Sequence, residues 1–164
     1  MARFGSWEWV IPENRVTWSD EIYRLHGHRP QAFALTFERA VEQIVPEDLG
    51  RIQRNLADAV RKARSHDLPG VEYRIHRTDG AERVLLGKAR LTVGPTGEPL
   101  RMVGTVQDIT EDKQAEREHR ISESLQRSLL PDRLPEIPGL EVAARYVPAT
   151  SDMQVGGDWY DVVL

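Results

Sequence analysis

The 164-residue chain contains no cysteine, which excludes disulfide bonds, thiolate metal sites and cysteine nucleophiles. It has no apolar run near the roughly 18 residues that a membrane helix needs, and its first residues lack the apolar core of a signal peptide. A chain without cysteine suits a reducing compartment. We therefore expect a cytoplasmic protein with no membrane segment in this sequence.

An excess of charge of one sign is also missing. The net charge is −4, and acidic and basic residues are interspersed rather than clustered. Nucleic-acid binders carry a clustered basic face, so we expect no nucleic-acid partner. Hydrophobic residues make up 40% of the chain, which is long enough to bury a core.

The first half of the chain predicts two strands followed by three helices. Trp7, Trp9 and Ile11 alternate with their neighbours at period two, and residues 15–18 return after a turn.

Three helix starts come after these strands. Ser19 and Thr36 are good N-cap residues for two short helices, and Pro46 suits the first turn of a longer one. We expect the Asp-Leu-Pro-Gly sequence at 67–70 to end that helix. Its apolar residues fall on one helical face: Leu49, Ile52, Leu56, Val60 and Ala63.

The second half predicts three strands, at about 71–76, 83–93 and 100–108, with a hairpin turn at Asp79-Gly80. Because an isolated two-stranded hairpin is not stable in water, the early strands must join the later ones. The pattern predicts an α+β domain over residues 4–109, with one five-stranded antiparallel sheet and the helices against one face.

A charged helix is predicted after this domain. We interpret 110–130 as a signalling or linker helix with Thr110 as its N-cap. A strict heptad of apolar residues is absent, which favours a solvated linker, and a dimerising helix is the alternative. Three prolines then interrupt the chain between 131 and 138, before two weakly alternating segments.

Residues 7–113 resemble a PAS sensor domain of the type with a Trp-x-Trp first strand. The resemblance implies a five-stranded sheet, a small cavity between sheet and helices, and an exit helix that leads to an output domain. On this reading we expect a homodimer. The matching segments are 7–9 (WEW), 18–27 (WSDEIYRLHG), 45–48 (VPED), 72–75 (EYRI) with 79–80 (DG), and 104–110 (GTVQDIT).

The end of the chain resembles the start of a SpoIIE-like phosphatase, a metal-dependent serine/threonine phosphatase of bacterial stress and sporulation signalling. The matching segments are 125–131 (LQRSLLP), 134–135 (LP), 137–140 (IPGL), 144–146 (ARY), 148–149 (PA) and 156–161 (GGDWYD). A diguanylate cyclase hairpin also contains Gly-Gly-Asp, but the Trp-Tyr-Asp sequence that comes directly after it in this chain fits that family poorly.

The phosphatase resemblance implies that Asp158 is a ligand of a two-metal Mn²⁺ or Mg²⁺ site, which activates water for attack on a phosphoserine or phosphothreonine. It also implies that the substrate of the full enzyme is a phosphorylated anti-anti-sigma factor. One carboxylate cannot hold a metal pair. We therefore expect 131–164 to be a truncated start of that domain, with no catalytic residue and no activity in residues 1–164.

Aromatic residues are the candidates for a ligand cavity in the sensor domain: Trp7, Trp9, Phe33, Phe37 and Tyr73. Plain core packing is the more common use of such positions. His26, His28, His66 and His76 are the candidate ligands for a haem, which we do not expect. A cysteinyl–flavin adduct is excluded because the chain has no cysteine.

Together these patterns predict a bacterial PAS sensor module that regulates a C-terminal phosphatase of the SpoIIE type. The alternative is a PAS interaction or dimerisation module whose interior is filled by its own side chains and takes no ligand.

Overall fold

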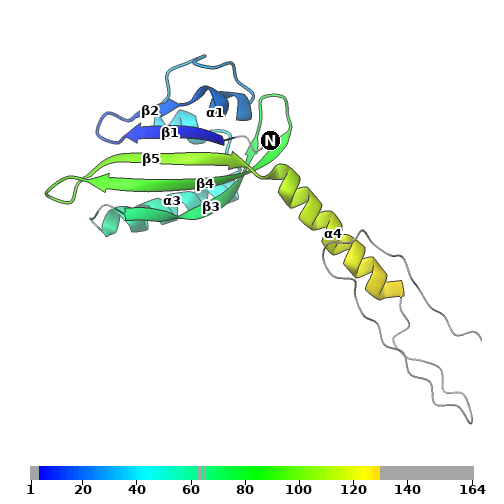
Figure 1. Cartoon of the computed structure of the whole chain (residues 1–164). Helices are drawn as coiled ribbons and strands as arrows, with labels where there is room; N and C mark the ends of the chain where they lie inside the picture. Colours follow the sequence, from blue (N-terminus) through cyan, green and yellow to red (C-terminus); the bar gives the residue numbers. More distant parts are fainter. Residues whose placement is uncertain (1–3, 63, 65, 130–164) are drawn as a thin grey trace, which may run out of the picture. The chain divides into compact units, whose positions relative to one another are not determined.

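The computed structural model describes residues 4–62, 64 and 66–129 (Figure 1). The elements in this part of the chain are β1 (Phe4–Val10), β2 (Arg15–Trp18), α1 (Asp20–Leu25), α2 (Phe37–Val41), α3 (Pro46–Arg61), β3 (His66–His76), β4 (Glu82–Val93), β5 (Pro99–Asp108) and α4 (Thr110–Leu129). The chain divides into two compact units, and the boundary falls inside α4, after Lys113. No helix among the described residues is both long and apolar enough to cross a membrane.

The five strands form one antiparallel sheet in the order β2-β1-β5-β4-β3. The first and last strands in sequence therefore lie side by side at its centre, with Trp7 opposite Gly104 and Trp9 opposite Met102. This confirms the predicted α+β class and the five-stranded sheet. The chain order β1, β2, helices, β3, β4, β5 is the one that the sequence pattern predicts.

One face of the sheet carries the hydrophobic core. Ile75, Leu85 and Val106 point from β3, β4 and β5 to the same side and pack against Ile22 and Leu25 of α1. The apolar stripe of α3 lies on the same face, where Ala59 packs with Leu91 and Met102. Helices α1, α2 and α3 therefore lie on one face of the sheet, as predicted, because the strand alternation leaves that face apolar.

Gly104 has a packing reason in the middle of β5. A side-chain carbon at this position would collide with the Trp7 ring and with the carbonyl oxygen of Lys88. The absence of a side chain therefore lets the Trp7 indole approach the β5 backbone closely.

The predicted end of α3 at 67–70 is wrong. The helix ends at Arg61, and β3 already begins at His66. Pro69 and Gly70 lie within β3, where the pairing register with β4 shifts between Leu68 and Val71. This edge strand tolerates a proline at such a bulge because the missing N–H is not needed for a second ladder.

The helices begin within one residue of the predicted positions, but of the three predicted N-caps, Ser19, Thr36 and Thr110, one makes the expected hydrogen bond. The Thr36 hydroxyl accepts from the Arg39 N–H, as a cap does. The Ser19 hydroxyl instead accepts from the Ser6 N–H on β1. Thr110 is the first residue of α4, and its hydroxyl accepts from the Val84 N–H.

Candidate functional site

An apolar cavity of about 170 Å³ lies between the inner face of the sheet and the helices. Aromatic and aliphatic side chains form most of its wall. The charged, amide and imidazole side chains in the wall are those of Lys88, Asn55 and His26. The remaining wall residues are Trp7, Trp9, Val16, Trp18, Ile22, Phe37, Ala40, Val41, Ile44, Ile52, Leu56, Leu68, Pro69, Val71, Tyr73, Gly87, Ala89, Met102 and Val106.

Four of the five aromatic residues singled out from the sequence are in this wall: Trp7, Trp9, Phe37 and Tyr73. Phe33 is not. Its ring packs edge-on against Tyr23 and His28, and the Arg39 guanidinium lies 4.9 Å above it. Phe33 therefore closes a neighbouring cluster outside the cavity.

Trp18 is a wall residue that the candidate set omitted. Its indole lies 4.5 Å from the His26 ring and packs edge-on against Tyr23. A strand tryptophan next to a predicted helix cap gives no signal of which side it faces. The position of α1 beside β1 and β2 decides that.

His26 is buried directly after α1, with 3% of its surface exposed. Burial lowers its pKa to about 4, and the charges of His28 and Arg77 act in the same direction, against the opposing effect of the hydrogen bond to Gln43. The imidazole is therefore neutral at physiological pH. In sequence this histidine lies in a His-Gly-His segment, which gives no signal of its burial.

Gln43 fixes which nitrogen of His26 carries the proton. The Gln43 side-chain amide donates to the carbonyl oxygens of His26 and His76, at 3.1 and 3.0 Å. Both N–H groups of that amide are then used, so its Oε1 accepts the 2.9 Å hydrogen bond from His26 Nδ1. Neutral His26 therefore carries its proton on Nδ1 and leaves Nε2 as an acceptor.

Trp9 supplies a polar atom of the opposite kind. Its indole stacks on Phe37 at a centroid distance of 4.5 Å and an interplanar angle of 26°. Trp9 Nε1 is buried and has no hydrogen-bond partner within the described residues. A buried N–H without a partner costs free energy, on the order of 1–3 kcal/mol, and this atom has essentially no surface open to solvent or to the cavity.

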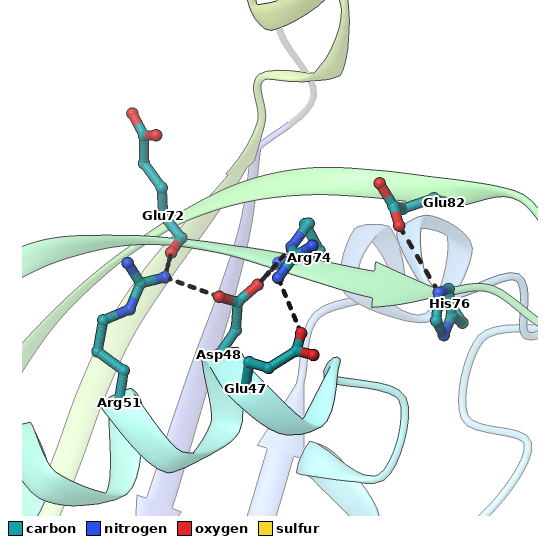
Figure 2. Close-up of polar contacts among 7 residues, drawn as sticks. All are labelled: Glu47, Asp48, Arg51, Glu72, Arg74, His76 and Glu82. Carbon is teal, nitrogen blue, oxygen red and sulfur yellow. Dashed lines mark hydrogen bonds and ion pairs between the residues drawn. The ribbon is translucent and has the colours of Figure 1, made fainter.

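A second polar group, the Asp48 cluster, joins the start of α3 to β3 (Figure 2). Asp48 is buried and accepts from the Arg74 backbone N–H at 3.0 Å and from Arg74 Nε at 2.8 Å. Two more ion pairs complete the cluster: Arg51 pairs with Asp48, and Glu47 pairs with Arg74. Hydrogen bonds from Arg74 hold the pKa of Asp48 below its ordinary value, so the cluster is charged and paired.

The start of α4 is held on the two strands that also form part of the cavity wall. Thr110 is buried, and its hydroxyl accepts from the Val84 N–H at 3.0 Å. The Ile109 N–H donates to the Val84 carbonyl oxygen at 2.9 Å. Lys113 forms a 2.9 Å ion pair with Glu72 of β3.

The described residues contain no group of three or more histidine, aspartate or glutamate side chains that could hold a metal ion. His28 packs against Phe33, and His76 pairs with Glu82 at 3.6 Å. His66 Nδ1 contacts the Arg64 carbonyl oxygen at 2.6 Å. The predicted metal ligand Asp158 lies outside the described residues, as do the other residues from 130 onward.

Comparison with known proteins identifies the fold family. The family profile described as "PAS fold" matches residues 15–106, more than half of the chain. Blue-light-activated histidine kinases of Brucella, including those of Brucella ovis and Brucella abortus, are 30% identical over 116 residues. The match covers 71% of this chain, and the chain spans 22% of the length of these relatives.

Solved structures of PAS-containing proteins share this fold. A sensory box histidine kinase/response regulator from Burkholderia thailandensis is 26% identical with a TM-score of 0.63, and the match covers 77% of this chain and 92% of that one. The N-terminal domain of a diguanylate cyclase with a PAS/PAC sensor from Marinobacter aquaeolei has a TM-score of 0.57 at 16% identity, with coverage of 67% and 98%. The second likeness concerns the fold alone.

Proposed function

The chain belongs to the PAS fold family, and on that premise we propose that it senses a small molecule in its cavity and passes the signal to an output domain through α4. The observation that carries this proposal is that strands β3 and β4 both line the cavity and hold the start of α4. Val71 and Tyr73 of β3 line the cavity, while Glu72 between them pairs with Lys113 of α4. On β4, Val84 holds the first turn of α4.

A ligand can act through this arrangement when it binds one conformation of the wall better than another. Any shift of β4 beside the ligand alters the two hydrogen bonds that the Val84 backbone makes, one with the Ile109 N–H and one with the Thr110 hydroxyl. The cavity is smaller than the roughly 300–1,000 Å³ that drug-sized ligands occupy. The expected ligand is therefore small, and for that reason we do not propose haem.

The relatives' name specifies activation by blue light. No residue of this chain can form a cysteinyl adduct with a flavin, because the 164 residues contain no cysteine. Light sensing through that chemistry is therefore not part of the proposal, and uptake of a small molecule is the proposed signal.

The proposed output domain is a SpoIIE-like serine/threonine phosphatase. Support comes from the sequence resemblance at 125–161, in which Asp158 is the metal ligand for Mn²⁺ or Mg²⁺ and a phosphorylated anti-anti-sigma factor is the substrate. A histidine kinase is the competing output, because kinases carry the matching segment in the Brucella relatives. In a protein with the complete output domain, loss of Mn²⁺-dependent phosphatase turnover in Asp158→Ala supports the phosphatase. Full turnover in that variant, or autophosphorylation on histidine, overturns it.

Sensing itself is tested by filling the cavity. Ala40 of α2 lines it, so Ala40→Leu should occupy the space and weaken binding of an added probe such as indole more than about 10-fold, since volume is the first requirement of a buried ligand site. Ala57→Leu is the matched control, because Ala57 is exposed on α3. The measurements are calorimetric titration and hydrogen exchange at the Val84 and Ile109 amides with and without indole.

The expected result is that indole slows or accelerates exchange of these two amides in the wild-type chain and in Ala57→Leu, but not in Ala40→Leu. Bound indole with unchanged exchange at both amides would refute transmission through α4. A natively purified chain that carries no small molecule and takes up no probe would support the alternative, an interaction or dimerisation module.

A further inference from the structure

We infer that small molecules enter the cavity through an opening at its edge, between Asn55 of α3 and the Pro69–Gly70 bulge of β3, and that Arg51 is the latch that limits how far this opening widens. The inference rests on the proposed ligand-sensing function and adds the route by which a ligand reaches the cavity. Three observations carry it: the exposed residues of the wall, the hydrogen bonds between α3 and β3, and the bulge.

The exposed residues of the cavity wall mark the opening. Among the described wall residues, the exposed ones are Asn55, Pro69 and Lys88, and the others are buried or half-buried. Leu56 and Leu68, the chain neighbours of Asn55 and Pro69, pack in one hydrophobic cluster. The cavity therefore meets solvent where the middle of α3 passes the start of β3.

The side of α3 that faces β3 is held by polar contacts in the first half of the helix. Asp48, Arg51 and Asn55 are spaced by three and four residues, so they lie on one side of the helix. Asp48 accepts from the Arg74 N–H at 3.0 Å, and Arg51 Nη2 donates to the Glu72 carbonyl oxygen (Figure 2). Asn55 follows one turn later, and its side chain has no hydrogen-bond partner among the described residues.

The same contacts place Asn55 beside the bulge. The helix advances from Asp48 to Arg51 while its partners on β3 step back from 74 to 72, so α3 and β3 run in opposite directions. A helix rises about 1.5 Å per residue and a strand about 3.3 Å, so the next turn brings Asn55 to positions 69 and 70. Pro69 has no N–H to donate, and the register with β4 shifts between 68 and 71. The bulge therefore offers α3 one backbone donor fewer at this point.

Arg51 is placed to act as the latch. Its guanidinium pairs with Asp48 at 3.1 Å and also reaches the carbonyl oxygen of Glu72, so it joins its own helix to the strand. Its side chain is 48% exposed, which lets water replace the contact with the strand. Near the other end of α3, Ala59 is buried and packs against Leu91. Each break of the Arg51 contact therefore frees the middle of α3 to move away from the bulge.

Exchange rates of a small probe test the latch on the 164-residue chain. The probe is 5-fluoroindole, whose entry rate, release rate and dissociation constant are measured by fluorine NMR. Arg51→Met keeps the aliphatic part of the side chain and removes its donors. It should speed both entry and release about 5-fold, as expected for one hydrogen bond, and change the dissociation constant less than about 2-fold.

Arg54→Met is the matched control for the latch. Arg54 is an exposed arginine of the same helix, and its side chain has no hydrogen-bond or ion-pair partner among the described residues. Its replacement should leave both rates as they are in the wild-type chain. Equal acceleration in both variants would show that removal of a charge from α3, rather than release of the latch, opens the cavity.

A reversible block tests the opening without relying on the latch. The chain contains no cysteine, so Asn55→Cys and the control Ala57→Cys each carry a single thiol, both at exposed positions of α3. Modification with benzyl methanethiosulfonate should slow entry and release of the probe more than about 10-fold at position 55 and leave both rates unchanged at position 57. Dithiothreitol removes the label and should restore the rates.

The outcomes separate this inference from the proposed function. Uptake of the probe at equal rates in every variant, labelled or unlabelled, would overturn the inference and leave ligand sensing intact. Weaker binding with unchanged release in labelled Asn55→Cys would also overturn it, because the label would then fill the cavity rather than block its opening. No uptake by the wild-type chain would remove ligand sensing and the entry route together. If Arg51→Met does not fold, the block at position 55 decides.

Discussion

His26 in the cavity wall and Asp48 in its cluster are both buried polar side chains, but they differ in charge and in how fully the protein satisfies their hydrogen bonds. Asp48 is charged, and Arg74 and Arg51 pair with its carboxylate (Figure 2). His26 is neutral, and Nδ1 makes its one ring hydrogen bond within the described residues. A buried group whose bonding capacity is filled by the protein serves the fold. A buried group with an unused lone pair keeps bonding capacity that the fold does not fill.

Thr110 is a third kind of buried polar residue. Its hydroxyl is satisfied, but by a strand rather than by its own helix. It therefore joins two elements and takes part in neither a charged cluster nor the cavity wall. The three residues can be separated experimentally, because each predicts a different size of effect and a different dependence on pH.

The largest effect is expected from pH acting on His26. Its pKa is about 4 in the folded chain and has an ordinary value of 6.5 in the unfolded chain, so the unfolded state binds the proton first. Stability should be full above about pH 6.5 and fall by about 3 kcal/mol as the pH drops to about 4. Urea unfolding at a series of pH values measures this loss.

The non-titrating variants His26→Phe and His26→Gln should both lack this part of the pH profile. A loss between pH 6.5 and 4 that is as steep in both variants as in the wild-type chain would show that His26 is not its source. Below an ordinary aspartate pKa of 3.8, the lowered pKa of Asp48 adds a separate loss, which only Asp48 variants should remove.

The next effect is expected from Asp48→Ala. The substitution removes a buried acceptor of three hydrogen bonds from Arg74 and Arg51, and should lower the free energy of unfolding by about 2 kcal/mol. Glu47→Ala is the control, since that exposed partner of Arg74 should contribute less than about 0.5 kcal/mol. Equal losses in denaturant unfolding would mean that burial does not distinguish the two carboxylates.

A smaller effect is expected from Thr110→Val, which has nearly the same shape but leaves the Val84 N–H without its acceptor. We expect a loss of about 1 kcal/mol and faster hydrogen exchange at the Val84 amide. Thr110→Ser keeps the hydroxyl and should retain slow exchange. If both variants exchange alike, this hydroxyl does not hold α4 on β4.

The smallest effect is expected from Glu72→Ala, which breaks the exposed ion pair with Lys113. Unfolding experiments should detect at most about 0.5 kcal/mol, with the difference disappearing at high salt. Its value lies in the comparison with Asp48→Ala: a loss as large as that of the buried carboxylate would contradict the distinction between paired buried and exposed charges.

The elements of the sheet were predictable because each depends on a short pattern. Period-two alternation located β1, and Asp79-Gly80 located the turn between β3 and β4. The failure at 67–70 has a local cause. Proline and glycine are common both at the end of a helix and at a bulge in an edge strand. Pairing with β4 places this Pro-Gly pair at a bulge.

The candidate site was predictable to a lesser degree. Aromatic character alone placed Trp7, Trp9, Phe37 and Tyr73 among the cavity candidates, but it equally selected Phe33, which packs elsewhere. Gln43 gave no signal, because a glutamine in a polar stretch is ordinary until two carbonyl oxygens are found at its amide.

The α+β class, the strand alternation and the absence of thiol chemistry follow from residue types and from spacings within a few positions. Tertiary structure alone decided that His26 is buried and neutral, that its free nitrogen is Nε2, and that Trp9 lacks a partner within the described residues. Those properties depend on groups 17 or more positions apart, such as His26 and Gln43, which only the packing of helices on the sheet brings together.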